Sequence, residues 1–336
     1  MAKKKGKTLP TVGVVGSGSF ATAIVKMLLE NAKLVHWCVR NEFVKGALEL
    51  RGHNPNYLTA VAFDVKKLKI TTDINELVSA CDIVVLATPS IYLADAIEKM
   101  TCDYEGKLFV SAIKGIVPKH NDVVAHYLRD VFKIGFRSQA VIAGPCHAEE
   151  VAMERLSYLT IAAAEKEHID SLRELFTSDY IKVSCSKDIL GKEYSAILKN
   201  IYAIAAGIAS GLGYGDNFNA VLVSNAIREM ELFLDAIYPE HREVNDSAYL
   251  GDLLVTAYSL FSRNRNLGNL IGKGYTVKSA VQSMSMVAEG YYATRGIYEI
   301  AFEKKLKTPI INTVFSILYE GKDAEKQFKK LTEKLT

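Results

Sequence analysis

The feature that most constrains the fold is the alternation of two sequence patterns over the first 187 residues. Short apolar, β-branched segments predict strands at 11–16, 33–39, 68–72, 82–89, 107–114, 139–145, 157–163 and 181–186. Between most of them lie amphipathic segments with apolar residues at helical spacing, as at 20–32, 122–132 and 167–176. Strands and helices in alternation predict a doubly wound, mainly parallel sheet with helices on both faces.

The pattern changes after residue 188, where helical patterns dominate and no convincing strand pair occurs. Helices are predicted at 189–211, 216–237, 247–262, 276–301 and 308–319. A chain of 336 residues exceeds what one hydrophobic core usually supports. The sequence therefore predicts an α/β domain over 1–187 and an all-α domain over 188–336, divided between Ser186 and Gly191.

A glycine-rich turn follows the first predicted strand and precedes the first predicted helix. Residues 16–21, Gly-Ser-Gly-Ser-Phe-Ala, have the G-x-G-x-x-A spacing of a dinucleotide-binding turn. Gly16 permits the tight turn, Gly18 lets the backbone approach a pyrophosphate, and Ala21 keeps helix and strand close. The helix N-terminus adds unpaired N–H groups for the phosphates. This context predicts that the first domain is Rossmann-like.

The end of the second predicted strand bears on the choice of cofactor. Val39 ends the strand, and Arg40 stands nearer to it than Glu42 does. A carboxylate at this place usually binds the ribose hydroxyl of NAD, whereas an arginine suits the 2′-phosphate of NADP. The sequence slightly favours NADP and leaves NAD open, because an arginine in such a loop can also be a solvated surface charge.

Two lysines stand in unusual surroundings. Lys199 is the only charged residue between Glu193 and Asp216, in a run that is otherwise apolar, small or neutral. A buried ammonium is costly unless it is paired or its pKa is lowered. Lys114 ends an apolar strand just before Gly115, so its charge can project into a cleft at the carboxyl edge of the sheet. Both lysines are candidates for chemistry.

The helical half adds further polar candidates. Asp252 stands at a predicted helix start, where the alternative role of its carboxylate is a helix cap. Residues 262–265, Ser-Arg-Asn-Arg, combine a hydroxyl, an amide and two guanidinium groups. This cluster is suited to binding phosphate, because arginine binds phosphate through two hydrogen bonds. The alternative, that these polar residues only mark a solvated helix terminus, is equally consistent with the sequence.

Several classes of chemistry are not indicated. The five cysteines form no C-x-x-C pair and the seven histidines no H-x-x-H pattern, so neither a disulfide framework nor a metal site is expected. A reduced, cytoplasmic location fits this cysteine usage. No P-loop sequence occurs.

The basic excess is concentrated at the N-terminus. The net charge of +3 comes largely from residues 1–7, which are predicted to be a solvated tail, with contact to an anionic surface as the alternative. Without a clustered basic face elsewhere, no nucleic-acid partner is expected. No apolar segment of signal-peptide type follows the tail, and the low-charge stretch 200–215 is too short for an integral membrane segment.

Eight sequence blocks, in order, resemble the bacterial type of NAD(P)-dependent glycerol-3-phosphate dehydrogenase over almost the whole chain. They are GSGSFATA, ATPS, SAIKG, AGPCHAEEVA, LKNIYAIAAGIASGLGYGDN, LGDLLVT, SRNRNLG and VAEGYYATRGIYEIA. The resemblance implies a Rossmann-like domain, a helical substrate domain and a possible homodimer. It also implies reversible reduction of dihydroxyacetone phosphate, a small phosphorylated substrate, to sn-glycerol 3-phosphate for phospholipid synthesis.

The resemblance also implies roles for individual residues. Lys199 would exchange the proton at the substrate oxygen, with Lys114 beside it and Asp252 orienting the pair. The substrate-binding residues would be Lys114, Gly144, Cys146, Lys199, Asn200, Asp252, Ser262, Arg263 and Asn264. To the glycine turn and Arg40 it adds these cofactor-binding residues: Ser19, Phe20, Pro89, Lys114, Ala148, Arg263, Val287 and Glu289.

The chain also departs from the family pattern. Cys146 and His147 stand where a hydroxyl residue and Phe are common, Ser195 and Ala196 where two glycines are usual, and Val39 where Arg or His is frequent. Two other functions remain open at this point: a related reductase of a 3-hydroxy or 2-keto acid, and a non-catalytic NADP-binding regulator. Binding of phosphate by residues 262–265 would distinguish the glycerol-phosphate enzyme from the carboxylate reductase.

Overall fold

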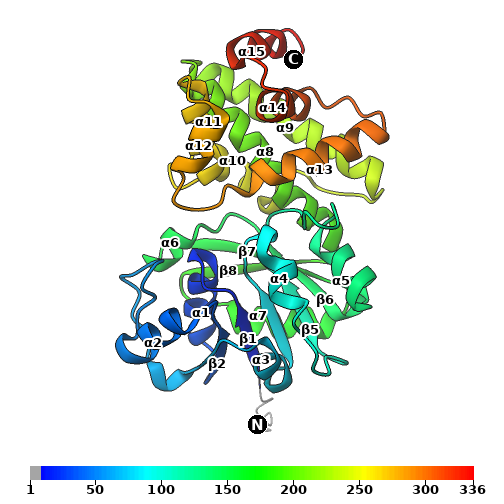
Figure 1. The fold of residues 1–336 in the computed structure, drawn as a ribbon. Coiled ribbons are helices and arrows are strands. Elements are labelled where there is room, and N and C mark those ends of the chain that lie inside the picture. The colour runs from blue at the N-terminus through cyan, green and yellow to red at the C-terminus, as the bar shows by residue number, and fades with distance from the viewer. Residues whose placement is uncertain (1–8) are drawn as a thin grey trace.

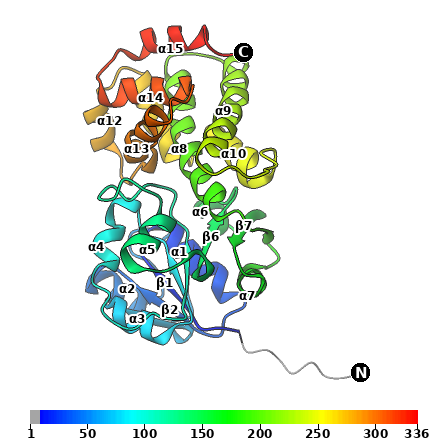
Figure 2. The same cartoon turned by 90° about the vertical axis from the view of Figure 1, so that its right-hand side faces the viewer.

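The computed structural model describes residues 9–336, which form two domains, one stacked on the other (Figure 1). The predicted basic tail lies outside the described residues. Figure 2 shows the same stacking from the side, with the strands confined to one domain and α9–α15 to the other. The predicted fold class, a Rossmann-like sheet domain followed by a helical domain, is confirmed.

All eight predicted strands form one sheet with the order β3-β2-β1-β4-β5-β6-β7-β8. Their bounds are β1 Val12–Val15, β2 Val35–Cys38, β3 Leu68–Thr71, β4 Ile83–Leu86, β5 Leu108–Ser111, β6 Gln139–Ala143, β7 Ser157–Ala163 and β8 Ile181–Ser186. Neighbouring strands are parallel except β6 and β7. Strands β1, β2, β4 and β5 are buried throughout, which explains their continuous apolar runs. The strand order reverses between β1 and β4, where such sheets bind ligands.

Helices cover both faces of the sheet and build a separate core on each. The helices of this domain are α1 Ser19–Leu29, α2 Glu42–Arg51, α3 Ile74–Ala80, α4 Leu93–Ile97, α5 Val124–Phe132, α6 Ala148–Ala152 and α7 Lys166–Phe176, with 3₁₀ turns η1 Val65–Lys67, η2 Ser90–Tyr92 and η3 Phe136–Ser138. Ile24 of α1 and Leu172 of α7 belong to one core, and Leu77 of α3 and Leu128 of α5 to the other.

The helical domain is built around α8 (Ile189–Gly211). Every α8 residue from Ile189 to Ala209 is buried, as expected of a helix that is mainly apolar on all sides. Around it lie α9 Asp216–Ile237, α10 Asp252–Tyr258, α11 Arg263–Gly272, α12 Val277–Ser283, α13 Glu289–Glu303, α14 Pro309–Tyr319 and α15 Ala324–Thr332. None of the helices in the described part of the chain is both long and apolar enough to cross a membrane.

Two predicted helices are divided in the structure. Segment 247–262 forms a π-helical turn, η4 (Ser247–Gly251), and then α10, and it ends because the Ser262 hydroxyl caps the separate helix α11. Segment 276–301 divides into α12 and α13. Asp252 continues directly from η4 and its side chain caps no backbone N–H, so its alternative role as a helix cap is wrong.

Candidate active site

A cavity of about 1000 Å³ lies between the carboxyl edge of the sheet and the helical domain. Its walls come from the glycine turn, from the segments after β2, β4 and β5, and from α8, α10, α11 and α13. Most sequence-predicted site residues line it: Gly16, Gly18, Ser19, Phe20, Arg40, Pro89, Lys114, Cys146, Ala148, Lys199, Asn200, Asp252, Ser262, Arg263, Asn264, Val287 and Glu289.

Gly144 is the exception. It has φ +103°, and a Cβ there would point at the backbone of β7, 2.9 Å from the Tyr158 carbonyl oxygen, rather than into the cavity. Its carbonyl accepts a hydrogen bond from the Lys114 ammonium at 3.5 Å. The structure therefore places Gly144 behind Lys114 and not in the cavity wall.

The two candidate lysines share a single carboxylate. Asp252 Oδ1 accepts a hydrogen bond from the Lys199 ammonium, and Asp252 Oδ2 lies 3.6 Å from Lys114 Nζ. Lys199 is 4% exposed and Asp252 is 1% exposed. Burial lowers the pKa of Lys199 to about 7, with Asp252 opposing the shift and Lys114 adding to it. Within the otherwise apolar run, Lys199 and Asn200 thus form part of the inner wall of a cavity, and the Lys199 ammonium is paired.

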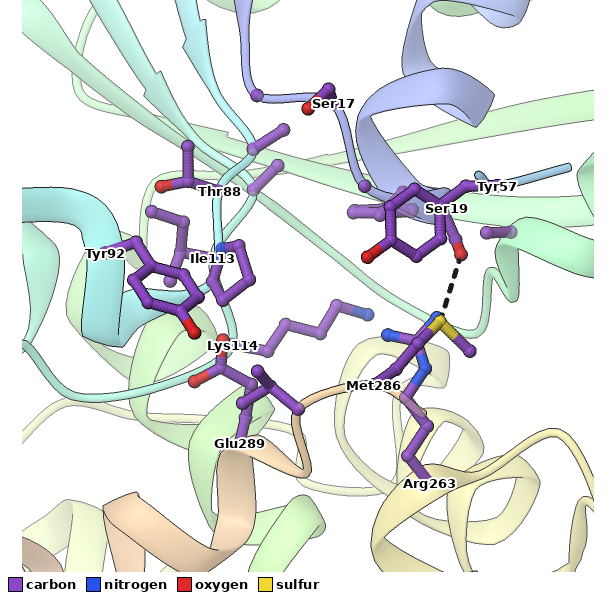
Figure 3. A pocket seen from close by; sticks show the side chains of 18 of the residues that line it. Ser17, Ser19, Tyr57, Thr88, Tyr92, Ile113, Lys114, Arg263, Met286 and Glu289 are labelled. Carbon is purple, nitrogen blue, oxygen red and sulfur yellow. Dashed lines mark hydrogen bonds between the residues drawn. The ribbon is translucent and has the colours of Figure 1, made fainter. Parts of the chain in front are cut away.

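Further contacts fix Lys114 in place. Asn200, the next residue of α8, donates from Nδ2 to the Lys114 carbonyl oxygen at 2.9 Å. The Lys114 ammonium also lies 5.4 Å from the centre of the Phe20 ring. Figure 3 shows Lys114 and Arg263 reaching into the same space from opposite walls. The positive charges therefore gather where the two domains face each other.

The glycine turn has the geometry of a phosphate cradle. Gly16 has φ +128°, and a Cβ there would lie 2.6 Å from the Ala87 carbonyl oxygen. A Cβ at Gly18 would meet nothing within 4 Å, so the backbone at the start of α1 is open to the cavity. Ser19 Oγ lies 3.5 Å from the sulfur of Met286, drawn as a dashed line in Figure 3. These features fit a dinucleotide pyrophosphate at the helix N-terminus.

Residues 262–265, the polar cluster, have different roles: Ser262 and Asn264 hold the local structure through hydrogen bonds, whereas the Arg263 side chain makes few contacts. Ser262 caps α11, and Asn264 Oδ1 accepts a hydrogen bond from the Gly290 N–H at 2.9 Å. Arg263 Nη2 lies 3.6 Å from Glu149 Oε1, and its buried Nε has no hydrogen-bond partner among the described residues. Arg265 does not line the cavity. Of the two arginines in this cluster, Arg263 is therefore the one that lines the cavity, and it has one donor without a partner among the described residues.

Glu289 links the cavity wall of the helical domain to the sheet domain. Its carboxylate accepts hydrogen bonds from the backbone N–H of Ser90, at 2.8 Å, and from the Ser90 hydroxyl. Burial raises the pKa of Glu289, and the Ser90 donors and Arg263 counteract that rise.

Sequence reasoning assigned no role to several residues that line the cavity. They include Tyr57, Tyr92, His147 and Met286. Burial and the positive charges of Lys199 and Lys114 lower the pKa of His147 to about 4, so its imidazole is neutral. In the sequence, only their positions near the ends of predicted strands could have indicated Tyr92 and His147 as cavity residues. No motif indicates Tyr57 or Met286. In residues 9–336 no group of three or more His, Cys, Asp or Glu side chains could hold a metal ion.

A dinucleotide-type glycine turn opposite a buried lysine–aspartate pair, with a helical domain closing the cavity, defines a two-domain NAD(P)-dependent dehydrogenase. The chain belongs to the NAD-dependent glycerol-3-phosphate dehydrogenase family. The family's N-terminal model matches residues 11–169, and its C-terminal model matches residues 188–329.

Individual relatives agree with this assignment. Glycerol-3-phosphate dehydrogenase [NAD(P)+] of Chlorobium limicola is 34% identical over 318 residues, which cover 94% of this chain and 95% of that protein. The crystal structure of glycerol-3-phosphate dehydrogenase from Coxiella burnetii has a TM-score of 0.90 at 26% identity, covering 97% of this chain and 100% of that one. A ketopantoate reductase from Ralstonia eutropha, with a TM-score of 0.60 and 16% identity, shares the fold alone.

Proposed function

We propose that this chain catalyses the reversible NAD(P)H-dependent reduction of dihydroxyacetone phosphate to sn-glycerol 3-phosphate. The observation that carries the proposal is the buried Lys199–Asp252 pair, with Lys114 beside it, facing the glycine turn across the cavity. Relatives named glycerol-3-phosphate dehydrogenase [NAD(P)+] support the substrate and the reaction. Supply of glycerol 3-phosphate for phospholipid synthesis is consistent with this activity.

Lys199 is the proton donor at the substrate carbonyl oxygen. When bound, the nicotinamide nucleotide supplies the hydride. The Lys199 ammonium gives one proton to the oxygen and becomes a neutral amine, and in the reverse direction the amine takes that proton back. A pKa near 7 makes both forms available at neutral pH. Asp252 orients the ammonium, and Lys114 keeps a positive charge beside the oxygen on which negative charge develops.

Arg263 binds the substrate phosphate, with Ser262 and Asn264 completing the group. Its unsatisfied Nε and its place in the cavity support this role, since a guanidinium binds a phosphate through two hydrogen bonds. We also assign Cys146, Asn200 and Gly144 to substrate binding. Gly144 acts indirectly, because its carbonyl oxygen accepts a hydrogen bond from the ammonium of Lys114. Burial raises the pKa of Cys146 to about 12, so it contacts the substrate as a neutral thiol.

The cofactor lies along the glycine turn. Gly16, Gly18, Ser19, Phe20, Pro89, Lys114, Ala148, Arg263, Val287 and Glu289 bind it, and the open backbone at Gly18 supports this placement. For the division between the two domains we propose residues 187 and 188, because β8 ends at Ser186 and α8 begins at Ile189. The family resemblance supports a cytoplasmic homodimer, which light scattering and cell fractionation would test.

NADP is the preferred cofactor. Arg40 lines the cavity just beyond β2. Glu42, the competing carboxylate, does not line it and instead accepts a hydrogen bond from the Thr72 hydroxyl at 2.6 Å. We expect Arg40→Gln to raise the KM for NADPH about tenfold, equal to about 1.4 kcal/mol, and to leave the KM for NADH unchanged. An equal change for both cofactors would contradict the assignment.

The decisive experiment follows the absorbance of NADPH, and separately of NADH, with dihydroxyacetone phosphate for wild type and Lys199→Met. We expect the wild type to oxidise at least one cofactor and the variant to lose about 10²–10⁴-fold in kcat. Lys107→Met is the matched control, because the Lys107 ammonium donates to the Cys81 carbonyl oxygen near the amino edge of the sheet. A wild type that consumes neither cofactor would refute the proposed reaction.

A further inference from the structure

A buried polar cluster outside the cavity lies against the first turn of α8. It consists of Asp188, Lys192, Arg242 and Tyr249, none of which lines the cavity. Tyr249 is 2% exposed and Lys192 is 3% exposed. The Arg242 side chain is also 3% exposed. Burying so many polar groups is unfavourable unless they satisfy one another, so their arrangement needs an explanation.

Asp188 joins three segments of the helical domain. Its Oδ1 caps α8 by accepting a hydrogen bond from the Gly191 N–H at 2.8 Å. Its Oδ2 accepts hydrogen bonds from the Tyr249 hydroxyl at 2.6 Å and from Arg242 Nε at 2.7 Å. The Lys192 ammonium lies 3.5 Å from the centre of the Tyr249 ring. The ring and hydroxyl of Tyr249 are therefore both fixed to the beginning of α8.

Tyr249 belongs to the π-helical turn that carries Asp252. η4 ends at Gly251, and the Asp252 N–H donates back to the Ser247 carbonyl oxygen five residues earlier. A π-turn accommodates one residue more than an α-helical turn, and isolated π-turns are often found at functional sites. Relaxation of η4 to an α-helical turn would rotate Asp252 by about 100° around the helix axis. Such a rotation would carry its carboxylate away from Lys199.

We propose that Tyr249 is a positioning residue for the reaction: by fixing η4 to the first turn of α8 through Asp188 and Lys192, it holds the Asp252 carboxylate against Lys199. The cluster links the start of the helix that carries Lys199 to the turn that carries Asp252. The proposal rests on the proposed function, in which Lys199 is the proton donor.

The test compares Tyr249→Phe with Tyr180→Phe in the reduction of dihydroxyacetone phosphate. Both variants lose a partly buried tyrosine–carboxylate hydrogen bond, because the Tyr180 hydroxyl donates to Glu30 Oε1 at 2.8 Å within the sheet domain. We expect Tyr249→Phe to lose about tenfold in kcat, with a KM for dihydroxyacetone phosphate within about twofold of wild type. Tyr180→Phe should keep the wild-type kcat.

The pH dependence of kcat also tests the positioning role, because a purely structural role of Tyr249 would leave it unchanged. Lys199 is faced by Asp252 and Lys114, with the Cys146 thiol and the His147 imidazole also nearby. A displaced Asp252 attracts the ammonium less, so the pKa of Lys199 falls. The alkaline limb of kcat for reduction should therefore move to lower pH in Tyr249→Phe and stay in place in Tyr180→Phe.

A double-mutant cycle shows whether Tyr249 acts through Asp252. In an Asp252→Asn background, adding Tyr249→Phe should change kcat by less than about twofold. If Tyr249→Phe does not fold, Asp188→Asn replaces it, because the Asn oxygen still caps α8, whereas its NH2 group is a donor and accepts no hydrogen bond from Tyr249 or Arg242.

A folded Tyr249→Phe with wild-type kcat and pH profile, or a full tenfold loss that persists beside Asp252→Asn, would overturn the positioning role. Wild-type enzyme in the same assay distinguishes failure of the proposed function from failure of the positioning role. An inactive wild type overturns the proposed function together with this inference, whereas an active wild type with an unaffected Tyr249→Phe overturns the inference alone.

Discussion

At the scale of single residues, the central feature is that two lysines share one carboxylate. Asp252 contacts Lys199 through one oxygen and lies 3.6 Å from Lys114 through the other. The positive charge of Lys114 therefore destabilises the ammonium form of Lys199, and burial does so more strongly. The pair is arranged so that the inner lysine can change its protonation state near neutral pH.

The pH dependence of the two reaction directions should therefore be opposite. Reduction needs protonated Lys199, so its kcat should fall as pH rises through about 7, whereas oxidation needs neutral Lys199 and its kcat should fall as pH drops through the same value. Lys114→Met removes the neighbouring charge, which raises the pKa of Lys199 and moves both limbs to higher pH. Profiles of kcat in both directions test this, and a limb that stays in place or moves to lower pH in the variant would contradict it.

Burial of Lys199 could be predicted from the sequence because that residue is the only charge in a long apolar run. Other residue-level features could not be predicted, because tertiary contacts decide them. Gly144 faces β7 because of its positive φ, and Glu42 turns toward Thr72. The cluster around Tyr249 draws its members from separate segments of the chain, so no local pattern reveals it.

At the scale of elements, the approach of α11 to α8 positions the proposed phosphate-binding residues. Gly207 and Gly211 of α8 face Gly268 and Gly272 of α11 without room for side chains. A Cβ on Gly268 would lie 2.1 Å from the Ile204 carbonyl oxygen. Arg263 stands at the first position of α11, so the depth of this helix contact sets how far its guanidinium reaches into the cavity.

Gly268→Ala should force α11 away from α8. We expect a loss of about 1–3 kcal/mol in unfolding free energy, as for an overpacked core, and a higher KM for dihydroxyacetone phosphate because Arg263 moves with the helix. Urea denaturation and steady-state kinetics measure the two effects. Gly46→Ala in α2 is the control, since a Cβ there meets nothing within 4 Å. This variant should raise the free energy of unfolding by about 0.5–1 kcal/mol. A Gly268→Ala variant as stable as wild type would disprove the tight contact.

Element boundaries could be predicted where one physical pattern fills a whole segment. Helices at 189–211 and 216–237 were predicted with the bounds that the structure has, because α8 is buried almost throughout and α9 buries one regularly spaced apolar face. All eight strands were found, and burial is continuous along β1, β2, β4, β5 and β6. Segment 247–262 was predicted as one helix because its apolar spacing continues across η4 and beyond α10. Helix α15 was missed because only Phe328 and Leu331 are buried in an otherwise charged sequence.

At the scale of the whole molecule, the cavity exists only because the two domains are held face to face. Asn200 of α8 donates to the Lys114 carbonyl oxygen, and Asn121 of the sheet domain donates to Glu299 of α13 at 2.8 Å. The Ser90–Glu289 contact adds the link nearest to the proposed cofactor site, because Glu289 lines the cavity and Ser90 lies behind it. The relative placement of the walls thus depends on a few polar contacts together with the apolar core that α8 shares with Ile116, Val141 and Ala162 of the sheet domain.

Ser90→Ala should therefore weaken cofactor binding without removing any group from the cavity wall. The variant deletes one of the two donors to the buried Glu289 carboxylate. A hydrogen bond to a charged group contributes about 1.5–3 kcal/mol, and only part of this free energy affects cofactor binding. We expect the Kd for NADPH, measured by fluorescence titration, to rise about 3–10-fold while kcat stays within about twofold of wild type. Ser157→Ala is the matched control, because the buried Ser157 hydroxyl donates to the Arg155 carbonyl oxygen within the sheet domain alone. If Ser90→Ala and Ser157→Ala both bind NADPH as wild type does, the Ser90–Glu289 contact does not set the geometry of the cofactor site, and the remaining contacts between the domains must be sufficient for it.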